Sequence, residues 1–260
     1  MNILVFVKRV PDTESKIRID QQSNSIIKEG LNFIISPYDE YAMEEALRLK
    51  EAQGGKVTAV SVGTKENQVI LKKCLAMGAD EATLIKDDAG ETYDSLRVAK
   101  LLAQAVKQKF TEPHLLLFGK QSVGADNAQV PSMVAELLGM PQANVVTKLE
   151  IEGNKGTAYR EIEGASEKVS FSLPAVVSAQ KGLNEPRYET LKGIMMAKRK
   201  QIPELSLQDL GMKEEDLSPQ LEVVRMDAPP PRKAGKVVED EPPQAAKKLV
   251  EFLCQEAKII

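Results

Sequence analysis

Short apolar runs alternate with stretches of helical periodicity along the first half of the chain. The apolar runs occupy residues 3–7, 57–62, 82–85 and 115–118. Between them, apolar positions recur every three or four residues, the spacing of a helix with one buried face. Strands and helices in this order form βαβ units. We therefore expect residues up to about 140 to form a doubly wound, mostly parallel, Rossmann-like α/β sheet.

Four helices are expected between these strands. The clearest begins at Ser36, which can cap it, with proline at the first helical position and Asp39 in the first turn. A second begins at Thr64 and ends before Gly78, a residue suited to the left-handed conformation that follows many helices. The other two are predicted at residues 93–108 and 126–139. The apolar positions of the second helix include Val69, Ile70, Leu71 and Leu75, and the buried side of the fourth carries Val130, Val134, Leu137 and Leu138.

After Pro141 the apolar pattern changes to a period of two. Residues 145–151, 157–162 and 168–173 alternate apolar and polar positions and are joined by Gly-Asn and Glu-Gly turns. This pattern predicts antiparallel ribbons added to the edge of the sheet. A further apolar run, residues 175–178, can rejoin the core.

The last part of the chain has a different composition. From Ala228 it contains PPPRKAGK and EDEPP, in which prolines exclude regular structure and alternating charges favour solvent. We therefore divide the chain into an α/β nucleotide-binding domain, residues 1–227, and a proline-rich arm, residues 228–260. The arm ends in an amphipathic helix at residues 245–255. A helix this short needs a surface to pack on, and both the chain's own domain and a partner subunit are open as that surface.

Composition excludes several classes of function. The 260 residues are 42% hydrophobic and 28% charged, as in ordinary globular proteins, and the formal net charge of −3 gives no general attraction to nucleic acid or anionic lipid. The opening apolar run is too short to insert into a membrane. Two distant cysteines suit neither a disulfide framework nor a zinc site, so we expect a reducing compartment, cytoplasmic or, in a eukaryote, the mitochondrial matrix. No constellation for breaking bonds is recognisable, so an enzyme is not expected.

One loop is a candidate for phosphate binding. The sequence GKQSVGADNAQV places Gly119 directly after a strand, Gly124 in the turn, and Asp126, Asn127 and Gln129 at the start of a helix. Free backbone N–H groups at a helix N-terminus can hold a phosphate. The loop matches neither the Walker pattern nor GxGxxG, so a plain strand-to-helix turn is an equal alternative. Other carboxylates, such as Glu44, Glu45 and Glu51, fall on a helix face and are expected to be solvated.

A longer motif points to a family. Residues 169–200, VSFSLPAVVSAQKGLNEPRYETLKGIMMAKRK, closely resemble the signature of the electron transfer flavoprotein beta subunit. KRVPD at 8–12, SPYDEYAMEEALRLKE at 36–51, AMGAD at 76–80 and GKQ at 119–121 also look like their family counterparts. The resemblance covers essentially the whole chain. It implies a sheet like that of the adenine nucleotide alpha-hydrolases.

The resemblance implies a cofactor arrangement. Similar proteins are heterodimers in which the alpha subunit holds the redox FAD and the beta subunit binds a buried AMP. By position, Tyr38 would approach the flavin from the beta side. The AMP site would be formed by Phe6, Ser36, Val62, Gln121, Ser122, Val123, Gly124, Ala125, Asp126, Asn127, Ala128, Gln129 and Val130.

The resemblance also implies a way of binding partners. Composition alone favours the core for the apolar cluster of Leu191, Ile194, Met195 and Met196, with an exposed docking element as the alternative. The resemblance favours docking, because residues 184–200 match the recognition segment for acyl-CoA and other flavin dehydrogenases. Within it, Asn184 and Arg187 are expected to lock the turn by side-chain hydrogen bonds. Glu161 matches the acidic residue that holds the mobile FAD domain of the alpha subunit.

The phosphate loop departs from the family's usual pattern. GADNAQV has Ala128 and Val130 where AMP-binding relatives carry side chains that can donate to phosphate. Its AQV resembles the version in electron-bifurcating members, in which a second FAD replaces AMP and oxidises NADH. The recognition segment, however, resembles that of a simple carrier. The expected function is therefore a carrier that shuttles electrons from dehydrogenases toward a quinone oxidoreductase, and the alternative is a bifurcating flavoprotein.

Overall fold

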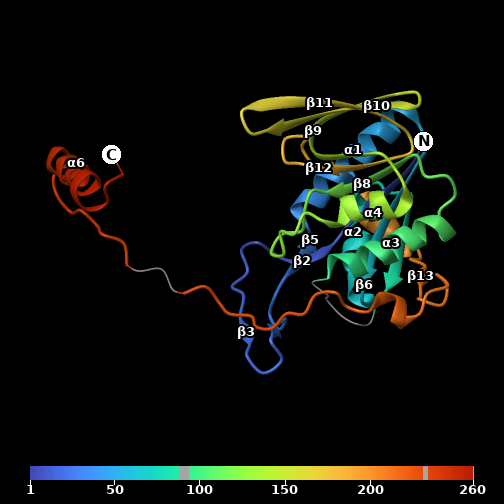
Figure 1. Ribbon diagram of the computed structural model, residues 1–260, viewed down its shortest axis with the longest axis horizontal. Helices are drawn as coiled ribbons and strands as arrows, with labels where there is room; N and C mark the ends of the chain where they lie inside the picture. Colours follow the sequence, from blue (N-terminus) through green and yellow to red (C-terminus); the bar gives the residue numbers. More distant parts are fainter. Residues whose placement is uncertain (88–93, 231–233, 260) are drawn as a thin grey trace.

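A mostly parallel sheet forms the centre of the protein, as the sequence predicts. The computed structural model describes residues 1–87, 94–230 and 234–259. Within them, one nine-stranded sheet has the order β11-β10-β9-β12-β8-β1-β6-β7-β13 (Figure 1). Its parallel centre consists of β1 (Asn2–Phe6), β6 (Lys56–Gly63), β7 (Glu81–Lys86), β8 (Leu115–Gly119) and β12 (Ala175–Ala179).

The two faces of the sheet bury separate cores, because alternate side chains of a strand point to opposite faces. In β1, Ile3 and Val5 join one core, and Leu4 and Phe6 join the other. The first core contains side chains of α1 (Pro37–Gln53), α2 (Gln68–Met77) and α5 (Leu191–Arg199). The second contains those of α3 (Ser95–Lys109), α4 (Val130–Leu138) and η2 (Glu214–Leu217). This doubly wound arrangement confirms the predicted fold class.

Two predicted helix starts differ from the structure. The fourth helix begins at Val130 and not at Asp126, because Asp126 and Ala128 have φ angles of 49° and 52°, which a right-handed helix cannot include. The short helix η1 (Lys65–Asn67) precedes α2 after Thr64. The third helix begins at Ser95, and its expected start at residue 93 lies outside the described residues.

Some details of these helices also differ from expectation. Ser36 stands at the N-cap of α1 but its side chain makes no capping hydrogen bond. Val69 is 67% exposed and Leu137 is 36% exposed, so neither contributes fully to the core. In both helices, apolar residues extend beyond the face that is buried. Gly78 ends α2 with a φ of 132°.

The antiparallel addition predicted after Pro141 is confirmed. It consists of β9 (Gln142–Glu152), β10 (Lys155–Ile162) and β11 (Ala165–Ser172). β9 pairs in parallel with β12, which joins the ribbons to the core. Short elements not expected from the sequence are β2 (Arg9–Pro11) with β5 (Phe33–Ile35), β3 (Ile19–Asp20) with β4 (Ser25–Ile26), and β13 (Glu204–Leu205) beside β7.

The C-terminal helix α6 (Pro242–Glu251) stands apart from the sheet domain at the end of the arm (Figure 1). It continues into a π-helical turn, Phe252–Glu256. Leu249 and Val250 are 48% and 51% exposed, so its apolar face is uncovered. Packing on the chain's own domain is therefore not what the structure has, and packing on a partner stays a prediction. Among the described residues, no helix is long and apolar enough to cross a membrane.

Candidate functional site

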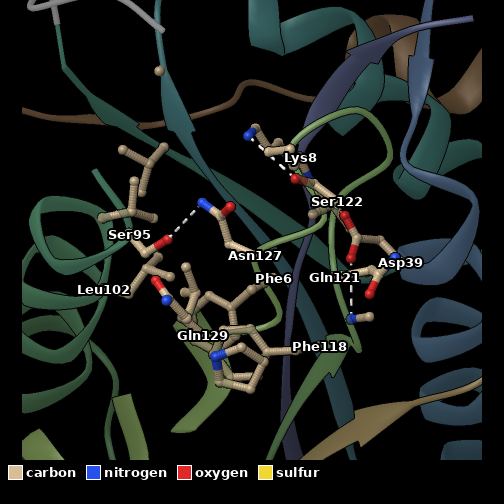
Figure 2. A pocket seen from close by; sticks show the side chains of 18 of the residues that line it. Phe6, Lys8, Asp39, Ser95, Leu102, Phe118, Gln121, Ser122, Asn127 and Gln129 are labelled. Carbon is tan, nitrogen blue, oxygen red and sulfur yellow. Dashed lines mark hydrogen bonds between the residues drawn. The ribbon is translucent and has the colours of Figure 1, made fainter. Parts of the chain in front are cut away.

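A pocket lies at the carboxyl ends of β1, β6 and β8. In the sheet, β6 and then β7 lie on one side of β1, and β8 lies on its other side. The crevice between β1 and β8 is thus a point where the strand order reverses, the usual ligand site of such sheets. The loops after both strands and the first turn of α3 wall the pocket (Figure 2).

The floor of the pocket is aromatic and apolar. The rings of Phe6 and Phe118 stack with their centroids 4.4 Å apart and an angle of 19° between their planes. Val62 from β6 and Leu102 from α3 extend this surface. A flat apolar floor of this kind suits the face of a nucleobase or another aromatic ring.

The rim of the pocket is the loop after β8, and its backbone has an unusual pattern. The φ angles are positive at alternate residues: 93° at Gly124, 49° at Asp126 and 52° at Ala128. Alternation of this kind is the backbone geometry of an anion-binding nest, and we call this stretch the nest. The Asp126 N–H within it donates to the Ser122 carbonyl at 3.0 Å, so the other N–H groups of the loop are the candidate donors to an anion. Two non-glycine residues held in this conformation are strained, and such strain concentrates at binding sites.

Side chains tie the loop to the surrounding elements. Gln121 Nε2 donates to Asp126 Oδ1 at 2.7 Å, and Asn127 Nδ2 donates to Ser95 Oγ of α3 at 3.2 Å. Lys8 Nζ, from the loop after β1, lies 3.4 Å from Ser122 Oγ (Figure 2). The loop is therefore held on both sides of the pocket.

Most of the residues predicted for the AMP site line this pocket. They are Phe6, Val62, Gln121, Ser122, Ala125, Asn127, Ala128, Gln129 and Val130. Ser36, Val123, Gly124 and Asp126 are not among its lining residues. Ser36 is fully buried, and its Oγ has no hydrogen-bond partner among the described residues. Gly124 and Asp126 contribute backbone conformation to the nest.

Sequence reasoning missed several polar residues of the pocket. Lys8, Arg9, Asp87, Asp94 and Ser95 line it and stand at strand ends or at the start of α3. Lys8 and Arg9 directly follow the first apolar run, and this was the available signal for them. Asp94 caps α3 by accepting from the N–H groups of Leu96 and Arg97.

A buried ion pair supports the α3 side of the pocket. Arg97 is 3% exposed and donates to both oxygens of Asp87, at 2.9 and 2.8 Å. It also donates to Glu214 Oε1 at 2.6 Å and to the Leu217 carbonyl at 3.1 Å. A buried guanidinium needs this full set of acceptors. Arg97 therefore fixes both η2 and the end of β7.

Asp39 joins the pocket from α1. Its side chain is 6% exposed, and its two oxygens accept hydrogen bonds from two different loops. Oδ2 accepts from the backbone N–H of Lys8 at 2.8 Å, and Oδ1 accepts from that of Gly119 at 3.0 Å. Burial raises the pKa of Asp39 to about 7, against the opposing effect of these two donors.

A second candidate site is the outer face of α5. Leu191, Met195 and Met196 are 84%, 64% and 54% exposed, and we call these three residues the docking face. Ile194 is partly buried and packs against the core, and Ala197 is buried. The apolar cluster predicted from the sequence thus divides into an inner anchor and an outer exposed face. Exposed apolar patches of this kind mark interaction surfaces.

The recognition segment is anchored on α1. Asn184 Nδ2 donates to Glu45 Oε2 at 2.9 Å and to the Tyr41 carbonyl at 3.0 Å. Arg187 donates to Glu44 through its backbone N–H, Nε and Nη2, and its guanidinium also reaches Glu51. The predicted hydrogen bonds are present, with partners on α1 and not within the turn itself.

The prediction that these carboxylates are solvated is wrong for two of them. Glu44 and Glu45 are 5% and 7% exposed, because the recognition segment covers them. Burial raises the pKa of Glu45. Glu51 remains exposed, and its hydrogen bond with Arg187 lowers its pKa. Ion-pair partners so distant in sequence are invisible to a helix-face argument.

Tyr38 and Glu161 occupy separate positions. Tyr38 is partly buried in the first turn of α1, and Lys120 Nζ lies 4.9 Å from the centre of its ring. Glu161 is exposed on β10, where it pairs with Ser166 of β11. Among the described residues, no group of three or more His, Cys, Asp or Glu side chains could hold a metal ion.

Known proteins resemble this chain over its whole length. The family model for the electron transfer flavoprotein domain matches residues 24–210. The electron transfer flavoprotein subunit beta of Bacillus subtilis is 45% identical over 262 residues, which cover 100% of both chains. That of Thermoanaerobacterium thermosaccharolyticum is 40% identical over 97% of this chain and 98% of its own. The subunit beta of Sus scrofa is 40% identical over 92% of this chain and 93% of its own. The chain therefore belongs to the electron transfer flavoprotein beta subunit family.

Proposed function

We propose that this protein is the AMP-binding beta subunit of a heterodimeric electron carrier. An alpha subunit would hold the FAD, which supplies the redox chemistry. The heterodimer would accept electrons from acyl-CoA and other flavin dehydrogenases and pass them toward a quinone oxidoreductase. In this proposal the chain itself binds a structural nucleotide, contacts the flavin and docks partners, and it catalyses no reaction of its own.

The observation that carries the AMP assignment is the nest at Gly124, Asp126 and Ala128. Apart from the Asp126 N–H, which donates to the Ser122 carbonyl, its backbone N–H groups and the N-terminus of α4 that follows them favour a phosphate dianion without any side-chain donor. This explains how the loop can hold phosphate although Ala128 and Val130 carry no polar atoms. The stacked Phe6 and Phe118 offer an apolar surface for the adenine at the other end of the pocket.

The docking face supports partner binding. Leu191 and Met195 stand one helical turn apart on the exposed side of α5, beside Lys198 and Arg199. A flexible apolar centre with a basic rim suits an apolar pocket with an acidic border on a dehydrogenase. Tyr38 would meet the flavin ring, and Glu161 on the projecting β10–β11 ribbon would hold the mobile FAD domain of the alpha subunit.

The alternative function is a bifurcating flavoprotein in which a second FAD takes the place of AMP and oxidises NADH. The loop sequence GADNAQV favours it, since Ala128 and Val130 leave room where AMP-binding relatives carry polar side chains. The two functions share the fold, the nest and the partner subunit. They differ in the number of flavins.

Cofactor content tests the proposal. The chain is co-expressed with its alpha subunit, the purified complex is denatured, and released nucleotides are separated by chromatography and quantified. One FAD and one AMP per heterodimer would support the carrier. Two FAD and no AMP would overturn it in favour of bifurcation. A complex with FAD alone would remove the nucleotide role of this subunit altogether.

A further inference from the structure

Asp39 has a position that the proposed nucleotide role does not explain. It is a nearly buried carboxylate in the wall of a pocket that is expected to take an anionic ligand (Figure 2). A carboxylate pointing at a phosphate would weaken binding by like-charge repulsion. Both of its oxygens, however, accept backbone N–H groups of the protein, at 2.8 Å from Lys8 and 3.0 Å from Gly119.

These two N–H groups belong to the two loops between which the pocket opens. Lys8 follows β1 and Gly119 ends β8, at the point where the strand order reverses and the connecting chains leave in opposite directions. One carboxylate therefore bridges the gap between two neighbouring strand ends. The Ser36 N–H also donates to the Lys8 carbonyl at 2.9 Å, which adds a second link to the β1 side.

Packing at Gly119 makes this bridge close-fitting. A Cβ atom at Gly119 would lie 2.4 Å from Asp39 Oδ1 and 2.6 Å from the carbonyl carbon of Tyr38. Only glycine allows the first turn of α1 to approach the end of β8 so closely. The end of β8 is therefore packed directly against the turn that carries Tyr38.

We propose that Asp39 is a positioning residue for the nucleotide: its carboxylate ties the loops after β1 and β8 together and so sets the width of the pocket. The carboxylate does not contact phosphate in this arrangement, which leaves the nest as the phosphate site. The inference rests on the proposed function in taking AMP as the ligand. It makes pocket shape and the position of Tyr38 depend on a single side chain.

The charged state of Asp39 matters for this role, because an ionised carboxylate accepts at both oxygens equally well. Three other titratable groups lie around it. Lys8 faces it from the loop after β1, Cys74 from α2, and Glu40 follows it in the same turn of α1. Glu40 is paired with Lys73 at 2.7 Å. With its pKa raised to about 7 by burial, Asp39 titrates within the range in which the protein can be studied.

The test compares the wild-type chain with Asp39→Asn, in complex with its alpha subunit and freed of nucleotide. Asparagine keeps the shape but replaces one acceptor by an NH₂ group, so one of the two backbone N–H groups meets a donor. We expect AMP affinity at pH 8, measured by titration calorimetry, to fall about tenfold, the value of one charge-assisted hydrogen bond. Exchange of the Lys8 or Gly119 amide hydrogen, measured by NMR or mass spectrometry, should become faster. Glu136→Gln is the control, since it removes an exposed carboxylate of α4 that bridges no loops, and it should change neither quantity.

A pH profile separates positioning from general destabilisation. Wild-type affinity for AMP should fall between pH 8 and pH 6 by more than that of Asp39→Asn, in which the group cannot titrate. The ionisation of AMP itself affects both proteins equally. Unchanged amide exchange in Asp39→Asn would overturn the bridge, and faster exchange with unchanged AMP affinity would overturn its role in positioning. If the wild type binds no AMP, the proposed function fails, and amide exchange alone then decides whether Asp39 ties the loops.

Discussion

Gly193 rests directly on the carbonyl group of Ala76. A Cβ atom at Gly193 would lie 2.2 Å from that oxygen, so α5 touches the last turn of α2 without an intervening side chain. Lys72 of α2 strengthens the contact by donating to the Ala197 carbonyl at 2.9 Å, near the C-terminus of α5. Lys200 donates in return to the Asp80 carbonyl at 2.7 Å. The docking face is thus presented by a helix that is already ordered, which lowers the entropic cost of binding.

Gly193→Ala should displace α5 from α2. The added methyl group cannot fit against backbone, and overpacking of this kind costs about 1–3 kcal/mol. Thermal unfolding should show a lower midpoint, and amide exchange in residues 193–200 should become faster. Gly235→Ala is the control, because a Cβ there meets no atom within 4 Å. Equal behaviour of the two variants would contradict the close contact.

Leu191→Ala should impair docking and leave the fold intact. Leu191 is 84% exposed, so its truncation should change the free energy of unfolding by less than about 0.5 kcal/mol. A central apolar anchor at an interface is worth about 2 kcal/mol, so kcat/KM for reduction by an acyl-CoA dehydrogenase should fall roughly 30-fold. Leu221→Ala provides the comparison, since Leu221 is 53% exposed and lies outside the recognition segment. Equal rates for both variants would remove Leu191 from the docking face.

Arg187→Met should destabilise the recognition segment through Glu44. The substitution leaves the buried carboxylate of Glu44 without its charged partner. We expect a loss of about 2 kcal/mol in the free energy of unfolding, measured by urea denaturation. The double variant Arg187→Met, Glu44→Gln should recover part of this loss, because no unpaired charge then remains. Additive losses in the double variant would show that the pair is not coupled.

Ala128→Gly should stabilise the chain. Ala128 has a φ of 52°, where a Cβ atom costs roughly 1 kcal/mol and glycine is strain-free. The midpoint of thermal unfolding should therefore rise. Ala125→Gly tests the same loop at a residue without positive φ and should lower the midpoint. The prediction fails if both substitutions act in the same direction.

Asp39 should give the protein a characteristic dependence of stability on pH. The pKa of its carboxyl is raised from 3.8 to about 7 in the folded chain, so between these values the folded state holds a proton that the unfolded state has released. The free energy of unfolding should therefore fall as pH rises from about 4 to about 7 and level off above, by an amount on the order of a few kcal/mol. The difference between wild type and Asp39→Asn, measured by denaturant unfolding across this range, isolates the contribution. Parallel profiles would show that the carboxyl titrates normally.

The local pattern of the sequence determined the elements and their order. Apolar runs such as residues 57–62 are long enough to define a buried strand, and Ser36-Pro37 and Gly78 mark the two ends of helices through backbone preferences that depend on few neighbours. The motif at residues 169–200 indicated the family. The loop after β8 was predicted to bind phosphate from its position after a strand. Its positive φ angles were not predicted.

The tertiary structure alone decided which side chains meet. Asp39 reads locally as a first-turn residue of α1, yet it accepts from Gly119, 80 positions along the chain. Glu44 reads as a solvated position on a helix face, yet Arg187, 143 positions away, covers and neutralises it. Likewise, only packing separates the inner Ile194 from the outer Leu191. Periodicity records which face of an element is apolar, but the partner of a polar group is set by the path of the whole chain, because hydrogen bonds and ion pairs act only between atoms that folding has brought within a few ångströms.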